Sequence, residues 1–145
     1  YTKEQQGQNK VDALAFSIYR ATGKTPQTIN QKITPEVIAL PDKGLVIDCF
    51  DNQEARVCAR MISEINNYDC LHVGFSPKTT FSILWNKGYE PPEDIMGDYD
   101  ICQSQGARSF IQFVSGLATQ TIIEFLTTGA KSEFVGNSSS VSKLV

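Results

Sequence analysis

Four cysteines and one histidine are the residues whose types could do chemistry in this sequence. Cys49, Cys58, Cys70 and Cys102 are spaced 9, 12 and 32 residues apart, and none forms a Cys-x-x-Cys pair. A zinc site normally needs such a close pair, and His72 is the single histidine that could complete one. We therefore predict no metal site, and two disulfides formed in an oxidising compartment. Four cysteines allow three pairings, and the spacing does not select among them.

His72 is also the natural candidate for a general base. It lies in the segment 70–75, which alternates with period 2 as a half-buried strand does, so we expect a surface or interface side chain. The sequence contains no nucleophile elbow, phosphate-binding loop or metalloprotease motif. We predict that the chain is not an enzyme and uses no cofactor. A hidden triad assembled around His72 is the enzymatic alternative.

Acidic side chains are densest in residues 93–100. Asp94, Asp98 and Asp100 could bind calcium together with loop carbonyls. The EF-hand spacing and its terminal glutamate are absent, so the prediction is a solvated loop, with a calcium or contact surface as the alternative.

The composition indicates one folded domain. The chain has 145 residues, 41% of them hydrophobic and 20% charged, which is enough to build a core. A net charge of −3 without a local run of lysine and arginine argues against a nucleic-acid partner. No apolar run approaches the roughly 18–20 residues of a membrane span. Because the chain starts at Tyr1, we expect a mature or truncated fragment whose targeting segment lies upstream.

Two helices are predicted in the first half of the chain. Residues 3–21 carry an apolar stripe with helical spacing, and Gly23 suits a left-handed C-cap. The stripe consists of Val11, Leu14, Ala15, Ile18 and Tyr19. A second helix is expected over residues 52–66, with Asp51 or Asn52 as its N-cap and Cys58 on its apolar face.

Strands are predicted at residues 45–50, 70–75, 81–85 and 109–114. Residues 117–128 fit a strand and a helix equally well. From Gly129 onward the residues are small and polar, which is typical of a tail or linker. The order of elements predicts an α+β fold, in which one long N-terminal amphipathic helix packs on a mainly antiparallel sheet and a second helix is short.

The order of several short motifs resembles the central region of type IVb pilins and their minor pilins. The resemblance covers roughly residues 5–115. Its motifs are Gly23-Lys24-Thr25-Pro26, Lys32-Ile33-Thr34-Pro35-Glu36, Lys43-Gly44-Leu45-Val46-Ile47, Gln53-Glu54-Ala55-Arg56-Val57-Cys58, Met61-Ile62, Asn66-Asn67-Tyr68, Leu71-His72-Val73-Gly74, and Cys102 followed by Phe110-Ile111-Gln112-Phe113.

The resemblance implies a pilin-like globular domain over residues 1–115 that lacks the transmembrane half of its first helix. Residues 116–145 would be a C-terminal extension or linker. By analogy Cys58 would pair with Cys102, and the apolar stripe of the first helix would face the sheet. Cys49 and Cys70 are additional to the family pattern, and we predict that they pair with each other.

The implied function is that of a structural subunit, a minor pilin, of a bacterial type IV pilus. It would act through filament assembly, initiation and adhesion, with other pilin subunits as partners in a homo- or hetero-oligomer. It would contact the membrane only through the missing upstream helix, and would be anchored in the inner membrane before assembly into an extracellular pilus. The alternative is a secreted or periplasmic binding or inhibitor domain stapled by two disulfides.

Overall fold

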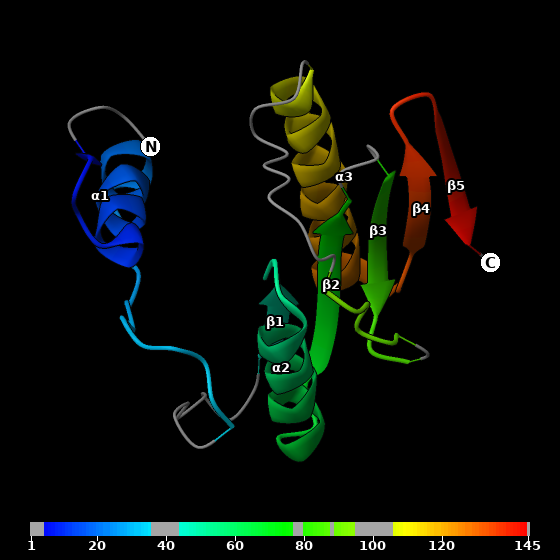
Figure 1. Cartoon of the computed structure of the whole chain (residues 1–145), viewed down its shortest axis with the longest axis horizontal. Helices are drawn as coiled ribbons and strands as arrows, with labels where there is room; N and C mark the ends of the chain where they lie inside the picture. The colour runs from blue at the N-terminus through cyan, green and yellow to red at the C-terminus, as the bar shows by residue number, and fades with distance from the viewer. Residues whose placement is uncertain (1–4, 36–43, 77–79, 88, 95–105, 145) are drawn as a thin grey trace. The chain divides into compact units, whose positions relative to one another are not determined.

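The chain folds as two compact units, Tyr1–Lys32 and Ile33–Val145, which are taken separately below (Figure 1). The computed structural model describes residues 5–35, 44–76, 80–87, 89–94 and 106–144.

The first unit is built on helix α1, Lys10–Thr22. The helix ends as predicted, because Gly23 adopts a φ of 72° and its N–H donates to the Tyr19 carbonyl. It begins later than predicted: the preceding residues turn back, and the Gln5 side chain donates to the Ala13 carbonyl over 2.8 Å. On the predicted stripe, Leu14 and Tyr19 are exposed. Packing of this stripe on the sheet stays a prediction.

The second unit is a mixed five-stranded sheet with helices, so the predicted α+β class is confirmed. Its elements in chain order are β1 (Leu45–Asp48), α2 (Gln53–Ile65), β2 (Asp69–Phe75), β3 (Thr80–Trp85), α3 (Ala107–Thr128), β4 (Glu133–Asn137) and β5 (Ser140–Leu144). The strands lie in the order β1-β2-β3-β4-β5. β1 and β2 are parallel and the other pairs antiparallel.

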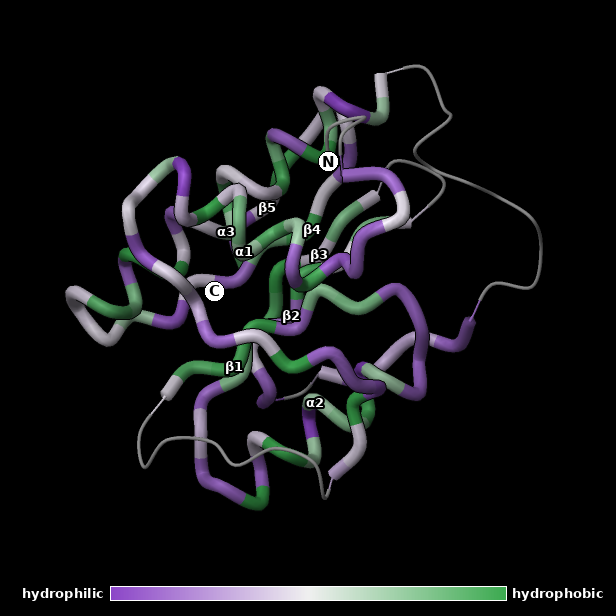
Figure 2. The backbone as a smooth tube through the Cα atoms, turned by 90° about the vertical axis from the view of Figure 1, so that its left-hand side faces the viewer, coloured by the Kyte–Doolittle hydropathy of each residue, from purple (hydrophilic) through white to green (hydrophobic). Residues whose placement is uncertain are grey.

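Strand β2 divides its side chains between the two helices of this unit. Leu71 and Val73 belong to the main core with Phe110 and Val114 of α3. On the opposite face, Gly74 lies against the guanidinium of Arg56 on α2. Figure 2 shows hydrophobic residues along β1 and at alternate positions of β2.

The strand predicted at residues 109–114 is wrong, because this segment lies within helix α3. Phe110, Val114, Ala118 and Thr121 are buried and recur at helical spacing, so one side of a 22-residue helix packs on the sheet. This packing overrides the local strand preference of Phe110–Val114. By length and composition α3 is also long and apolar enough to cross a membrane, a test that the core helix of a soluble protein passes as well.

The tail predicted from Gly129 onward is instead a β-hairpin, β4–β5. The Asn137 Oδ1 atom accepts from the backbone N–H of Ser139 over 2.8 Å and from that of Ser140 over 3.0 Å, which closes the turn. The Ser-rich composition therefore belongs to a turn and an exposed edge strand. The boundary expected between residues 115 and 116 falls inside α3.

Candidate functional site

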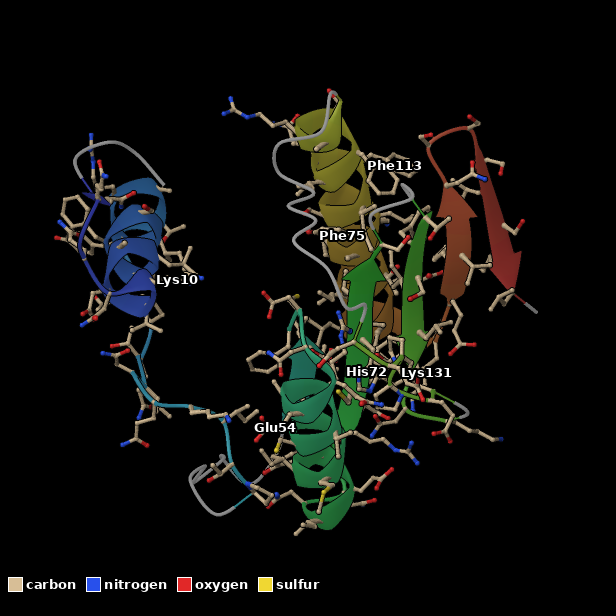
Figure 3. All side chains as sticks on the ribbon, viewed as in Figure 1. Lys10, Glu54, His72, Phe75, Phe113 and Lys131 are labelled. Carbon is tan, nitrogen blue, oxygen red and sulfur yellow. The ribbon has the colours of Figure 1, made fainter. Side chains whose placement is uncertain are left out.

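The most concentrated polar chemistry in the described residues is a buried network around Asp48 and His72. The two residues are opposite each other in the parallel register of β1 and β2. The Asp48 Oδ2 atom lies 2.7 Å from His72 Nδ1, and the exposed fractions of the two residues are 0% and 1%. Such a short contact away from water is strong because little solvent screens it. Figure 3 shows His72 on β2, beside α2.

The second ring nitrogen of His72 faces Asn86, just after β3. Its Nε2 lies 2.7 Å from the Asn86 Oδ1, while the Asn86 Nδ2 donates to the Ser63 Oγ over 2.5 Å. The Ser63 hydroxyl in turn donates to the Arg60 carbonyl. With the amide in this orientation, both ring nitrogens of His72 face an oxygen atom, one from Asp48 and one from Asn86.

Arg56 links this network to Tyr89. Its Nη1 donates to Asp48 Oδ2 over 3.4 Å and to the Tyr89 hydroxyl over 3.2 Å. The Tyr89 ring stacks on His72, with the ring centroids 3.8 Å apart. Burial raises the pKa of the Tyr89 hydroxyl, so it remains protonated at neutral pH. No buried side-chain nitrogen or oxygen in the described residues lacks a partner.

Cys70 is buried next to this network, and its thiol has low reactivity. Burial, and then the Asp48 carboxylate, raise the pKa of its thiol to about 12. The nucleophilic form of cysteine is the thiolate, so Cys70 is protonated and unreactive at neutral pH.

A cavity of about 450 Å³ adjoins the network at the start of α2. Arg56 and Tyr89 reach it from the network, and the ends of β2 and β3 form other walls. Its lining residues are Asp51, Asn52, Arg56, Gly74, Phe75, Ser76, Thr80, Phe81, Ser82, Tyr89, Pro92, Glu93 and Asp94. Asn52 caps α2 as predicted, accepting from the Ala55 N–H over 2.9 Å. The Asp94 Oδ1 accepts from the Gln53 N–H over 2.6 Å.

The predicted disulfides are not formed in this structure. Cys49, Cys58 and Cys70 are free thiols, and Cys102 lies outside the described residues. The sheet register explains why Cys49 and Cys70 do not meet. Val46, not Cys49, lies opposite Cys70. Three residues of strand span about 10 Å, which exceeds the Cα separation that a disulfide bridges.

Of the predicted acidic loop, Asp94 caps α2, whereas Asp98 and Asp100 lie outside the described residues. Among the residues that are described, no group of three or more histidine, cysteine or acidic side chains could hold a metal. The surface position expected for His72 is wrong, because α2, Asn86 and Tyr89 cover its face of the sheet.

Sequence reasoning missed Asp48, Arg56, Asn86 and Tyr89 as partners of His72. One signal was available: Asp48 interrupts the apolar run of β1, where a charge is costly unless it is paired. The partners themselves come from separate elements, and a single sequence gives no spacing that connects them.

No family model and no curated protein matches this chain. Among solved structures it is similar to that of PaaA, in its selenomethionine form, with a TM-score of 0.67 and 16% sequence identity. The match covers 99% of this chain and 57% of that one, so the chain spans little more than half of PaaA. At this identity the likeness shows a shared fold.

The prediction that the chain is not an enzyme is corrected, because it rested on the absence of short catalytic motifs and the fold that the chain shares with PaaA sets no such limit. Such motifs reveal only sites whose residues lie close together in the sequence.

Proposed function

We propose that the chain is a structural subunit of a type IV pilus, of the minor pilin kind, that acts by assembling with other pilin subunits. In this role it would be held in the inner membrane by a helix upstream of this sequence, and would then enter an extracellular filament.

The observation that carries the proposal is the folded form of the segment that resembles pilins. Residues 45–75 form strand β1, helix α2 with Cys58 on it, and strand β2. These are the elements that the resemblance implies for the motifs from Leu45 to Gly74, and they occur in the implied order. The free thiol of Cys58 and the parallel pairing of β1 with β2 are the features that depart from the expectation.

Exposed apolar side chains on α2 supply a further argument for assembly. Val57, Met61 and Ile65 lie four residues apart on one face of the helix, and all three are exposed. Ile65 has 70% of its surface exposed. Contact with a neighbouring pilin subunit would remove this surface from water, at about 25 cal/mol per Å² of apolar area.

The experiment is complementation of a gene deletion in the source bacterium, with filaments counted by electron microscopy and the subunit detected by immunoblot of sheared filaments. Deletion should reduce filament number and the wild-type gene should restore it. Ile65→Glu should fail to restore it. Leu126→Glu is the matched control on α3, because Leu126 is 68% exposed, and it should restore filaments fully. Unchanged filaments after deletion, with no subunit in the sheared fraction, would refute the proposal.

A second candidate is a secreted or periplasmic binding domain. The cavity of about 450 Å³ beside Arg56 favours it, because pockets of roughly 300–1,000 Å³ are typical of small-molecule sites. Binding of a small molecule by a chain that is absent from filaments would support this candidate instead.

A further inference from the structure

We propose that the cavity at the start of α2 binds a small aromatic zwitterion of the α-amino acid class, with its carboxylate on Arg56. This binding activity goes beyond the role of a filament subunit and does not depend on it.

The cavity lies where a sheet with parallel strands commonly binds ligands. Asp51 and Asn52 follow the carboxyl end of β1, and Gly74, Phe75 and Ser76 form the carboxyl end of β2, which is parallel to β1. Helix α2 begins at the same edge. Crevices outside the carboxyl ends of parallel strands are the usual binding sites of open α/β sheets, because loops and helix starts converge there.

Arg56 provides the recognition group for a carboxylate. Only 9% of Arg56 is exposed. The side chain makes two hydrogen bonds, to Asp48 and to Tyr89, and Nη1 donates both of them. Its Nε and Nη2 have no hydrogen-bond partner among the residues that the structure describes. Every buried side-chain nitrogen among the described residues has a hydrogen-bond partner. Because Nε and Nη2 of Arg56 have none, they are not fully buried, and they are open to the cavity that Arg56 lines. Nε and Nη2 form one edge of the guanidinium, which can bind both oxygens of a carboxylate.

Gly74 leaves the space that this guanidinium edge needs. A Cβ atom at position 74 would lie 3.2 Å from the Arg56 Nη2 and 3.4 Å from its Nη1. The guanidinium therefore lies directly over the β2 backbone, fixed on one side by Asp48 and Tyr89. A group held in this way loses little freedom when a ligand binds.

The rim of the cavity is negatively charged, opposite to the positive charge of Arg56. Asp51, Glu93 and Asp94 line it and are exposed. The Asp94 carboxylate already accepts from the Gln53 N–H, whereas Glu93 has no partner among the described residues. A simple anion would meet three carboxylates, and a simple cation would meet Arg56. A ligand that carries both charges satisfies both groups, with its ammonium toward the rim.

Aromatic walls supply the apolar part of the site. Phe75 and Phe81 line the cavity, and Phe75 is 40% exposed although it is a large apolar residue. Figure 3 shows Phe75 on β2, the strand that carries His72. Aromatic rings pair favourably in offset or edge-to-face arrangements, so an aromatic side chain suits these walls.

The test is calorimetric titration of the full 145-residue chain with three probes: L-phenylalanine, 3-phenylpropionate, which lacks the ammonium, and 2-phenylethylamine, which lacks the carboxylate. L-phenylalanine should bind about tenfold or more tightly than either of the other two. Glu93→Gln should weaken binding of L-phenylalanine about three- to tenfold and should not weaken binding of 3-phenylpropionate. Glu90→Gln is the matched control, because this side chain is 87% exposed and pairs with Arg60 away from the cavity lining.

Arg56→Lys keeps the charge but loses the two-nitrogen edge, and should weaken both carboxylate probes without weakening 2-phenylethylamine. Thermal unfolding of this variant verifies that it is folded, and the Glu93 variant provides the test if it is not. The proposal is overturned if L-phenylalanine gives no binding up to about 10 mM. It is overturned equally if the three probes bind alike, or if Glu90→Gln weakens binding as much as Glu93→Gln.

Discussion

Asp48 and His72 join the two parallel strands of the sheet through side chains that water does not reach. The Oδ2 atom of Asp48 lies 2.7 Å from His72 Nδ1 and also accepts from the Arg56 Nη1 over 3.4 Å. One carboxylate oxygen of Asp48 therefore contacts a side chain from strand β2 and a side chain from helix α2. Because buried charges are tolerated only when they are paired, the positions of β1, β2 and α2 depend on this residue.

Replacing Asp48 should be strongly destabilising. Asp48→Asn removes the charge but keeps the size, so Arg56 is left buried without its counter-ion, and we expect a loss of about 3–5 kcal/mol in the free energy of unfolding. Urea unfolding followed by circular dichroism measures this loss. Asp51→Asn, at an exposed position three residues later, should change stability by less than about 0.5 kcal/mol. Equal effects of the two substitutions would contradict the network.

Cys70 should make stability fall in alkaline solution. Its folded pKa of about 12 lies above the 9.0 of an ordinary cysteine thiol, so the folded state keeps a proton that the unfolded state releases. The stabilisation is complete below pH 9, and it is lost at about 1.4 kcal/mol per pH unit as the pH rises toward 12. Urea unfolding between pH 8 and pH 11 should show a smaller decline for Cys70→Ala than for the wild type. Parallel declines in the two proteins would show that Cys70 does not contribute.

Alkylation distinguishes the thiols at neutral pH. Cys70 should react with iodoacetamide only after unfolding, because it is buried, whereas the exposed Cys49 should react in the folded protein; a raised pKa slows the reaction of both thiols. Mass spectrometry of the labelled peptides gives the order of reaction. Rapid labelling of Cys70 in the folded protein would place it elsewhere than beneath α2.

Gly136 should not tolerate a side chain. A Cβ atom at this position would collide with the Ser140 carbonyl oxygen and lie 2.9 Å from the Phe81 ring, so Gly136→Ala must separate β4 from β5. We expect a loss of about 2 kcal/mol or more by thermal unfolding. Gly116→Ala, in helix α3 with nothing within 4 Å of the new atom, should be neutral or stabilising. Similar melting of the two variants would show that residues 133–144 are not part of the sheet.

The N-cap residues of α2 and α1, Asn52 and Asn9, allow a direct comparison of what a cap hydrogen bond contributes to stability. Asn52→Ala removes the bond to the Ala55 N–H and should cost about 0.5–2 kcal/mol. Asn9→Ala should cost much less, because the Asn9 side chain makes no cap hydrogen bond to α1. Chemical denaturation of the two variants compares them directly, and an equal cost would count against the geometry at Asn52.

Features fixed by neighbouring residues could be predicted from the sequence. Helix α2 follows from its apolar face and from Asn52, and the Gly23 C-cap follows from the backbone freedom of glycine. Strands β1, β2 and β3 follow from short apolar or alternating runs. In each case the cause lies within a few residues of the effect.

The rest depended on contacts between distant segments. Residues 109–114 have the composition of a strand, and only the longer spacing of Phe110, Val114 and Ala118 indicates α3. The polar alternation of β2 indicated an exposed face for His72, because nothing local shows that α2 returns to cover it. The cavity was beyond prediction for the same reason, since its walls come from four separate stretches of chain.

The spatial order of the strands across the sheet is the same as their order in the sequence, which is the order of their synthesis. Each new strand can therefore pair with the strand made before it, at the edge of the sheet. No strand has to insert between two strands that were made earlier. The pairing of β2 with β1 must wait for the connection 49–68, with α2 inside it, and the pairing of β4 with β3 must wait for the connection 86–132, with α3 inside it. Because loop closure is the main entropic barrier to pairing strands, this layout suits folding from the N-terminal strand onward during synthesis. At every stage each new strand pairs with the strand made before it. On β5, the strand at the final edge, the exposed Lys143 disfavours the addition of a strand from another molecule.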